Sequence, residues 1–475
     1  MNLRSRVAAC AALACLAACA SPPQPKPVAE LAPPQWQAPL PHNGSRTDLA
    51  AWWQQQGDAM LADLIAQAQE ASPDNGAARA RLEQARATRT AAGAALLPGL
   101  DAQVSSSRSN LQLGLPQAAT TTQAGLQAAW EIDLFGANRN TRNAAVARLD
   151  GAQAGWYAAR VSVAAEVATT YAELRTCERL RLVTAQDAKS RQETSRLAQL
   201  SAQAGFLAPA NAALARASAA EANSRAVQQA LQCDNAIKAL VVLSAMPEPQ
   251  LRARLAAESA AGIFAGASAK DGGAGFTIAS IPAEVLRQRP DLYIAEREVA
   301  AASYEVGAAD AARYPRLSVA GSVGVGRIHT AGSGTNSDTW TIGPVALSVP
   351  IFHAGTLRAN LEAARARYDS AQLQYRASVR QAVREVEMAL LILQGSTTRA
   401  ADTEIAAQGY RASFEATESR YRTGLGSLVE LEEARRTRLA AEIAQVTLEQ
   451  ERMLAWIALY RAAGGGWTGP AQAQP

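Results

Sequence analysis

An internal repeat in the amino-acid sequence restricts the folds that this chain can adopt. A shift of 217 residues aligns Pro73-Asp74 with Pro290-Asp291, Pro98 with Pro315, and Leu134-Phe135 with Ile351-Phe352. A shift of 219 residues aligns Gly205 with Gly424. A period of this length excludes the short stacked units of a solenoid. The sequence therefore predicts two copies of one unit, at residues 57–250 and 281–466, joined by a linker at residues 251–280.

Both copies have the same predicted order of secondary structure. A helix comes first and ends before Pro98 or Pro315. Two segments in which hydrophobic residues alternate with polar or small ones follow, with a polar loop between them. These segments are Leu100–Ser109 and Gln123–Leu134 in the first copy, and Leu317–Arg327 and Thr339–Val349 in the second. Alternating segments of about ten residues are typical of tilted transmembrane β-strands.

A very long helical stretch follows the predicted strands of each copy, Asn138–Ala204 in the first and Gly355–Thr423 in the second. A helix of about 70 residues is about 100 Å long, roughly three times the thickness of the hydrocarbon core of a bilayer. Each stretch ends at a glycine, Gly205 or Gly424, and the chain then returns as a shorter helix. Hydrophobic residues at alternating spacings of four and three predict coiled-coil packing between these antiparallel helices.

The N-terminal residues 1–18 have the pattern of a secretory signal, because Arg4 and Arg6 precede a short apolar core and a small-residue cleavage site. The segment Leu16-Ala17-Ala18-Cys19 resembles the lipobox of bacterial lipoproteins, in which the cysteine carries covalent lipid and becomes the first mature residue. An ordinary signal peptide with a chance cysteine is the alternative. The proline-rich residues 19–56 predict an extended, lipid-anchored tether that lies outside any packed core.

Composition and motifs exclude several classes of function. The chain carries 46 Lys and Arg residues against 42 Asp and Glu residues, spread along its length, and this balance does not favour nucleic acid as a partner. His42, His329 and His353 lie far apart, without Cys or carboxylate residues at ligand spacing, so we expect no metal site. No catalytic or nucleotide-binding motif is present, and we expect neither an enzyme nor a cofactor beyond the lipid on Cys19.

Two cysteines remain apart from the signal segment and Cys19, namely Cys177 and Cys233. Each is 28 residues from Gly205, so an antiparallel hairpin that turns at this glycine brings them level, about 40 Å from its tip. Both continue hydrophobic stripes of their helices. The sequence therefore predicts a disulfide between the two helices, and two buried free thiols are the alternative.

An ordered series of motifs resembles the outer-membrane efflux proteins of the TolC superfamily, in particular its lipoprotein branch, the NodT- or OprM-like outer-membrane factors of RND tripartite pumps. The matching segments are Ile281–Leu292, Ala295-Glu296, Gly307–Ala309, Tyr314-Pro315, Trp130–Gly136, Val349–Phe352 and Tyr421–Ala434. The resemblance covers essentially the whole chain after the signal segment.

The resemblance implies an α+β membrane protein. Three subunits, each with four strands, form one twelve-stranded transmembrane β-barrel, and a long α-helical coiled-coil barrel continues it across the periplasm. The residues alone support oligomerisation, because four strands cannot close a membrane barrel and an open sheet edge in lipid leaves backbone groups unsatisfied. The number three comes from the resemblance.

The resemblance also implies roles near the glycine turns. Glu430 and Glu433 match carboxylates that line a periplasmic constriction, and a solvated helix face is the alternative. Tyr421 matches a tyrosine that holds the helix tips closed through hydrogen bonds between helices, and ordinary helix packing is the alternative. Gly426 stands where related channels carry an arginine. Gly205, Gly424 and Gly426 are the expected turn residues of the hairpin tips.

Together these features predict a passive exit duct in the bacterial outer membrane that extends into the periplasm. A homotrimer receives small molecules or drugs from an inner-membrane RND pump through a periplasmic membrane-fusion adaptor, and an iris-like movement of the helix tips opens it. A channel for protein (type I) secretion and a lipid-anchored structural envelope protein without a pore are the alternatives. Residues 467–475 are predicted to form a disordered tail.

Overall fold

The computed structural model describes residues 31–38, 53, 58–110, 118–257, 282–330 and 333–467. The chain divides into two compact units, and each takes segments from both sequence repeats. The sheet unit includes Ala80–Gln153 and Tyr293–Ala377, and the hairpin unit includes Pro27–Arg79, Ala154–Leu292 and Ser378–Pro475. The predicted signal segment with Cys19, residues 258–281 of the predicted linker, and residues 468–475 lie outside the described residues.

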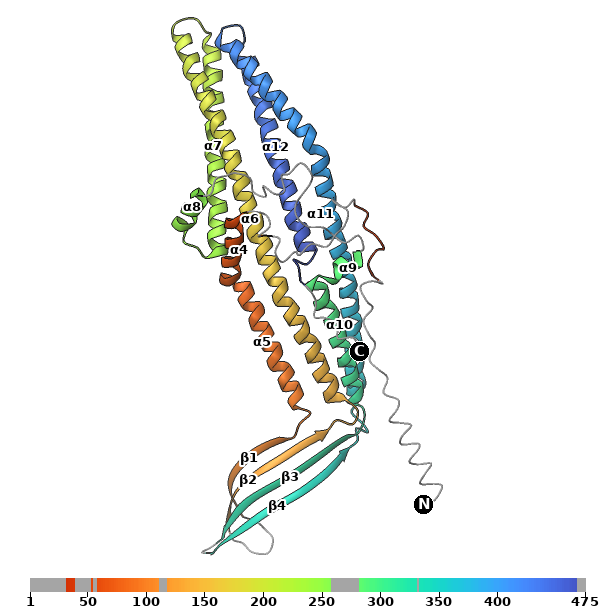
Figure 1. Cartoon of the computed structure of the whole chain (residues 1–475). Helices are drawn as coiled ribbons and strands as arrows, with labels where there is room; N and C mark the ends of the chain where they lie inside the picture. Colours follow the sequence, from red (N-terminus) through yellow and green to blue (C-terminus); the bar gives the residue numbers. More distant parts are fainter. Residues whose placement is uncertain are drawn as a thin grey trace. The chain divides into compact units, whose positions relative to one another are not determined.

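Four antiparallel strands form the sheet, in the order β1-β2-β3-β4 (Figure 1). They are β1 (Gly99–Asn110), β2 (Ala118–Ile132), β3 (Arg316–Thr330) and β4 (Ser333–Ser348). The prediction of two strands in each copy is confirmed, and the central pair β2–β3 joins the two copies. The strands are longer than predicted. Residues 328–338, expected to be a polar loop, are largely strand, because their Ser and Thr side chains are compatible with a ladder that continues past the hydrophobic residues.

Two long helices, α6 (Ala137–Gln203) and α11 (Thr356–Arg422), contribute their first part to the sheet unit. Each has 67 residues, and their bounds lie within one residue of the predicted ones. Most of α5 (Pro73–Ala94) and of α10 (Pro290–Ala311) belongs to the same unit. Small side chains allow close helix packing here, since Ala144, Ala147 and Ala301 form a buried cluster.

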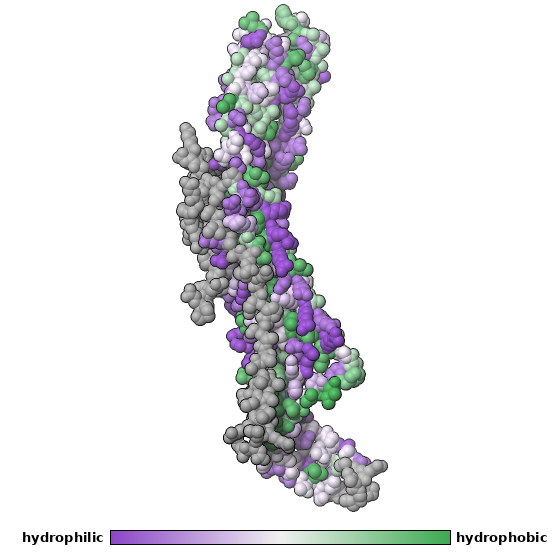
Figure 2. Space-filling model, turned by 90° about the vertical axis from the view of Figure 1, so that its right-hand side faces the viewer, coloured by the Kyte–Doolittle hydropathy of each residue, from purple (hydrophilic) through white to green (hydrophobic). Residues whose placement is uncertain are grey.

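The hairpin unit is built from two helical hairpins and several short helices (Figure 1). α6 returns as α7 (Pro209–Ser244), and α11 returns as α12 (Leu428–Ala462). The short helices are α4 (Ala59–Ala71), α8 (Glu248–Ala257) and α9 (Pro282–Arg287). The sequence analysis did not predict α4, and α8 extends into the residues predicted as linker. At the end of this unit where the two turns lie, hydrophobic and hydrophilic side chains are exposed next to one another (Figure 2).

The prediction that residues 19–56 form a tether outside any packed core is wrong for at least part of this segment. Trp36 and Trp53 are both buried in the hairpin unit. The backbone N–H groups of Gln37 and Ala38 donate hydrogen bonds to the Glu387 carboxylate of α11, with N···O distances of 2.5 and 2.7 Å. The burial of a tryptophan removes a large apolar area from water, and this outweighs the preference of the prolines for an extended, solvated chain.

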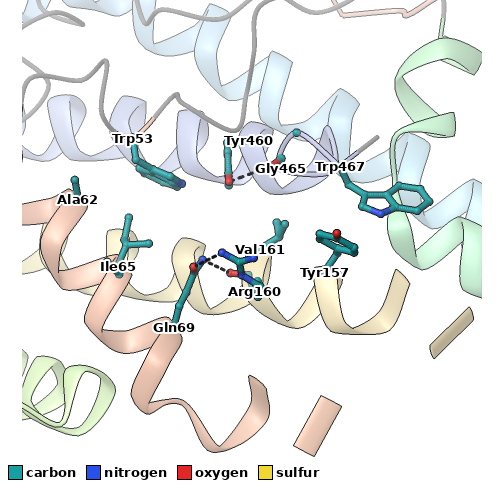
Figure 3. A pocket seen from close by; sticks show the side chains of 12 residues that line it. Trp53, Ala62, Ile65, Gln69, Tyr157, Arg160, Val161, Tyr460, Gly465 and Trp467 are labelled. Carbon is teal, nitrogen blue, oxygen red and sulfur yellow. Dashed lines mark hydrogen bonds between the residues drawn. The ribbon is translucent and has the colours of Figure 1, made fainter. Parts of the chain in front are cut away.

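A cavity of about 390 Å³ lies beside Trp53 (Figure 3). The Trp53 ring packs edge-on against Tyr460 of α12, with 4.7 Å between the ring centroids. Across the cavity, Gln69 of α4 and Arg160 of α6 exchange two hydrogen bonds of 3.1 Å. Trp467 lines the same cavity and is only 7% exposed, so the predicted disordered tail begins after this residue at the earliest.

Candidate functional site

The strand register separates the sheet into two chemically different faces. Pairs such as Leu126↔Val323 and Val323↔Trp340 place hydrophobic side chains in rows across the strands. The apolar face carries Leu100, Val104, Leu126, Trp130, Leu317, Val319, Val323, Val325, Trp340, Ile342, Val345 and Leu347. The polar face carries Asp101, Gln103, Gln123, Gln127, Glu131, Ser318, Ser322, Thr339 and Thr341.

The apolar face is open to solvent in the single chain. Ile342, Val104 and Trp340 are 91%, 77% and 72% exposed. A contiguous apolar surface of this kind indicates contact with lipid or with another protein. Along β3 the apolar rows extend from Leu317 to Val325, about 27 Å along the strand. The hydrophobic band of outer-membrane barrels is about 25 Å tall and strands cross it at a tilt of about 40°, so this length of strand covers about 20 Å of the height, most of a lipid-facing band.

Two glycines on the polar face bring β2 and β3 unusually close together. Gly125 and Gly324 are cross-strand partners. A Cβ atom on Gly324 would lie 2.7 Å from the carbonyl oxygen of Ala124, and one on Gly125 would lie 2.9 Å from that of Val323. Any side chain at these positions would therefore collide with backbone atoms. Glycines mark tight bends of barrel strands, so this pair favours a sheet that bends toward its polar face.

The two outer strands leave the sheet with open edges. Within the described residues, β1 and β4 each pair on one side only, with β2 and β3 respectively. The unpaired N–H and C=O groups of an edge strand find no partner in a lipid environment, where each costs several kcal/mol. The sheet is therefore complete only when other strands pair with these edges.

The turns of the two hairpins share one backbone geometry. Gly205 and Gly424 both have positive φ angles, 81° and 77°. The N–H of Phe206 donates to the carbonyl of Ser201 at 2.9 Å, and the N–H of Leu425 donates to that of Arg420 at 2.8 Å. This arrangement is the Schellman motif, which selects glycine because other residues are strained at such φ values.

Gly426 follows the second turn and is constrained by space. A Cβ atom on Gly426 would lie 3.1 Å from the backbone nitrogen of Tyr421. A side chain at this position would need the turn to shift by a few tenths of an ångström. Arg420 donates to the carbonyl of Leu425 at 3.3 Å, within the same turn.

Tyr421 lies at a contact between the two hairpins. It packs against a buried apolar cluster of Ala198 from α6, Ala215 from α7 and Leu428 from α12. Burial raises the pKa of its hydroxyl, Arg435 lowers it and Glu432 raises it, so that the pKa lies above the ordinary value of 10.0. The position fits both of the expected roles, a closing contact and helix packing.

Glu430 and Glu433 lie on the first turns of α12 and are half-exposed. Glu430 forms a capping box with Ser427, in which the Glu430 N–H donates to Ser427 Oγ at 3.1 Å and the Ser427 N–H donates to the Glu430 carboxylate at 3.3 Å. Glu433 pairs with Arg436, with 2.6 Å between charged atoms. The carboxylates are thus held by local contacts on a surface of the helix.

A buried polar network, which the sequence analysis missed, joins the two hairpins. Its centre is Arg435 of α12, which is 1% exposed. Arg435 donates hydrogen bonds to the Glu432 carboxylate at 2.9 Å and, in α6, to Ser190 Oγ at 3.0 Å and Thr194 Oγ1 at 2.8 Å. An arginine this deeply buried is stable only with such partners.

Glu432 extends the network into the first hairpin. Its carboxylate accepts a hydrogen bond of 2.6 Å from Ser218 of α7 and another from Arg191 of α6. Arg191 pairs in turn with Asp187, with 2.9 Å between Nε and Oδ2. Burial lowers the pKa of Arg435 and the charge of Glu432 opposes this, so the pKa of Arg435 lies below its ordinary value.

The sequence contains a signal for this network. Asp187, Arg191, Thr194 and Ala198 are all buried and follow one another at spacings of four, three and four. These are the core positions of a coiled coil, where charged residues are unusual and specify a partner. Arg435 likewise continues the stripe that begins with Leu428 and Leu431.

Further along the first hairpin, Cys177 of α6 and Cys233 of α7 are joined by a disulfide, with 5.4 Å between their Cα atoms. Another tie lies at the start of α10, where Arg289 donates to Asp291 and to Glu385 of α11 at 2.7 and 2.8 Å and to the carbonyl of Ala462 at 3.0 Å. Arg289, in the Ile281–Leu292 segment that resembles the family, therefore joins the start of α10 to the middle of α11 and to the end of α12.

The described part of the chain contains neither a membrane-spanning helix nor a cluster of metal ligands. No helix there is both long enough and hydrophobic enough to cross a bilayer. No group of three or more His, Cys, Asp or Glu side chains in the same residues has the proximity of metal ligands.

A four-stranded sheet with one lipid-sized apolar face, combined with two helical hairpins whose long helices have 67 residues, defines the class of outer-membrane channels with the TolC-like fold. The chain belongs to the outer membrane efflux protein family, whose model matches residues 64–245 and 281–465. The two matches confirm the internal repeat. Membership of this family makes the protein an efflux channel of the bacterial outer membrane that extends into the periplasm, and not an enzyme.

Individual relatives agree with this assignment. The chain is 30% identical over 464 residues to the pyoverdine export outer membrane protein OpmQ of Pseudomonas putida, and the match covers 95% of each chain. It is 29% identical over 439 residues to nodulation protein T of Rhizobium leguminosarum bv. trifolii, covering 91% of each. Among solved structures, the outer-membrane channel OprN has a TM-score of 0.80 and 27% identity, covering 92% of this chain and 98% of that one. The Campylobacter jejuni CmeC channel has a TM-score of 0.79 and 25% identity, covering 94% and 93%.

Proposed function

We propose that the protein is the exit duct of a tripartite efflux system. It is a passive homotrimeric channel that receives small molecules from an inner-membrane RND pump through a periplasmic adaptor. The observation that carries the proposal is the sheet with one exposed apolar face, one polar face and two open edges. Relatives that export pyoverdine or belong to a solvent efflux pump support small molecules, rather than proteins, as the cargo.

In this proposal the open edges of neighbouring subunits pair with each other. β1 of one subunit meets β4 of the next, and three subunits with four strands each close a barrel of twelve. The apolar face is then directed toward lipid and the polar face toward a water-filled lumen, as membrane barrels require. The close approach at Gly125 and Gly324 supports this direction of curvature, because the polar face lies on the inside of the bend.

The hairpin tips are the gate in this proposal. Three copies of Glu430 and Glu433 form acidic rings around the axis, which favour cations. Tyr421 and its apolar cluster hold the tips together in the closed state, and an iris-like movement around Gly205 and Gly424 opens them. The buried network around Glu432 supports movement of the two hairpins of a subunit as one piece, because it connects both.

Single-channel recording in planar bilayers tests the duct and the acidic rings together. The wild type is expected to conduct with cation preference, and the Glu430→Ala, Glu433→Ala double variant to conduct with a reversal potential closer to zero. Glu221→Ala removes an exposed carboxylate of α7 and is the matched control, with unchanged selectivity. A wild type without conductance, combined with an equally silent Tyr421→Ala variant, in which the closing contact at the tips is removed, would refute the duct.

We also propose that Cys19 carries the covalent lipid, as in the lipoproteins that its tetrad resembles. A Cys19→Ser variant is expected to lose radiolabelled acyl chains while the wild type incorporates them. Labelling that persists in the variant excludes this cysteine as the acylated residue.

A further inference from the structure

We propose that the outward end of the apolar face binds lipid phosphate, at a basic cluster formed by Arg108, Arg327 and His329. The proposal rests on the proposed function, because it needs the apolar face to be in contact with lipid. The ligand class is a membrane lipid with a phosphorylated headgroup, whose acyl chains lie along the apolar face and whose phosphate lies above it.

The strand register places the three residues next to each other on the apolar face. Arg108 of β1 is paired with Thr120 of β2, and Thr120 is paired with His329 of β3. Arg108 and His329 therefore lie in one row with a single strand between them, about 10 Å apart at the backbone. Arg327 precedes His329 by two residues and so shares its face.

The side chains of Arg327 and His329 converge over a glycine. Gly334 of β4 is the cross-strand partner of His329. A Cβ atom on Gly334 would lie 3.3 Å from both Nε and Nη2 of Arg327, and 3.4 Å from Nδ1 of His329. Both side chains thus occupy the space that a larger residue at this position would fill, and their nitrogen atoms meet at one place on the surface.

The cluster lies at the level where lipid headgroups begin. Val325 and Trp340 belong to the last apolar rows, and Arg327 lies two residues beyond Val325, about 7 Å along the strand. The long helices extend from the other end of the strands. Since the helices extend into the periplasm, the cluster faces the outer leaflet.

The basic cluster has a net positive charge, because its two arginines outnumber the one carboxylate near it. Between Ser105 and Gln123 the chain has one charged residue, Arg108, and between Gly326 and Thr339 it has Arg327, His329 and Asp338. None of the ion pairs found among the described residues involves Arg108 or Arg327. Asp338 is the carboxylate on this face, and it lies opposite Val325, one row closer to the apolar band. Two arginines beside one carboxylate favour a phosphate, to which guanidinium groups bind with paired hydrogen bonds.

A free phosphate ion would form the same hydrogen bonds but would gain nothing from contact with the apolar rows. Val325, Val323 and Trp340 are all more than half exposed next to the cluster. An amphiphile contacts both surfaces at once, and this continuity favours a lipid over a soluble anion.

The test uses the full-length, detergent-purified protein and lipid A with both phosphates as the probe. Binding is measured by titration, with lipid A lacking phosphates and inorganic phosphate as separate arms. Each arginine near a charged lipid surface strengthens binding about fivefold, so the Arg108→Gln, Arg327→Gln double variant is expected to bind phosphorylated lipid A about 25-fold more weakly. Arg316→Gln, on the polar face at the other end of β3, is the control without effect, and Asp338→Asn is expected to bind more tightly.

Several results would overturn the proposal. Equal affinity of wild type and double variant excludes the cluster, and equal binding of lipid A with and without phosphates excludes the headgroup. Inorganic phosphate that binds the wild type as tightly as lipid A identifies a free anion as the ligand instead. The conductance of the same preparation separates the two proposals: a conducting wild type without the affinity difference refutes the lipid site alone, whereas a silent wild type counts against the duct.

Discussion

Arg435 illustrates how single residues determine which helices pack together. It occupies a coiled-coil core position, where buried ion pairs in general contribute no more to stability than packed hydrophobic residues do. Its hydrogen bonds reach Ser190 and Thr194 of the other hairpin, and Glu432 beside it accepts from Arg191 and Ser218. Because these partners have fixed positions, the network allows one register between the hairpins and disfavours others.

Removal of Arg435 is therefore expected to be costly. An Arg435→Ala variant leaves Glu432 with fewer partners at a partly buried site, and breaking a buried ion pair in this way destabilises by about 3–5 kcal/mol. Arg436→Ala is the matched control, since this neighbouring arginine is 75% exposed and pairs with Glu433. An ion pair on a solvated surface contributes less than about 1 kcal/mol. Chemical denaturation of both variants measures the difference, and similar losses of stability would contradict a special role for the network.

The raised pKa of Tyr421 predicts that the stability of the hairpin tips depends on pH. Burial holds the pKa of Tyr421 above its ordinary value of 10.0. The charge of Arg435 lowers this pKa and the charge of Glu432 raises it. Between the ordinary and the raised pKa the packed state retains a proton that the unpacked state loses, so stability falls as the pH rises above about 10. The thermal midpoint of the wild type is expected to decline more steeply between about pH 9.5 and 11 than that of Tyr421→Phe. Tyr410→Phe, an exposed tyrosine of α11, should follow the wild type. Parallel curves for the wild type and Tyr421→Phe would exclude Tyr421 as the source.

At the scale of elements, the sequence was most informative where one physical preference acts alone. Pro98 and Pro315 marked helix ends because proline cannot continue a helix, and Gly205 and Gly424 marked the turns because other residues are strained at their positive φ angles. The alternation in β2 and β3 predicted the strands and the apolar face. The outer part of β4 was missed because both of its faces are polar there, and a polar alternation is indistinguishable from a loop.

The glycines of β3 provide a matched pair for testing the close approach of strands. A Cβ atom on Gly324 would lie 2.7 Å from a backbone oxygen, whereas one on Gly326, on the same face, would find its nearest atom at 3.8 Å. Gly324→Ala is expected to destabilise the sheet by about 1–3 kcal/mol, as overpacking does, and to lower the yield of assembled oligomer. Gly326→Ala should assemble as the wild type does on native gels. Equal yields from the two variants would show that β2 and β3 can separate without cost.

At the scale of the whole molecule, folding and assembly depend on each other. A single chain has an exposed apolar face and two open strand edges, which only lipid and neighbouring subunits satisfy. The N-terminal segment was predicted incorrectly at this scale, because composition alone does not reveal that Trp36 and Trp53 are buried, or that Trp53 packs against Tyr460 of the distant α12. The buried polar network centred on Arg435 was missed for a related reason. The residues that it joins across the two hairpins are more than 200 positions apart in the sequence, for example Arg191 and Glu432 at a separation of 241.

The most direct test of the account compares neighbouring residues on the two faces of one strand. Single cysteines at Thr341 and at Ile342 of β4 are treated with a charged thiol reagent while the conductance of the assembled protein is recorded, with Gln123 and Ala124 of β2 as a second pair. The account predicts that modification at Thr341 and Gln123 changes the conductance, because these positions line the lumen, and that modification at Ile342 and Ala124 leaves it unchanged. Equal effects on both faces, or no conductance to modify, would contradict a pore enclosed by the polar faces of pooled sheets.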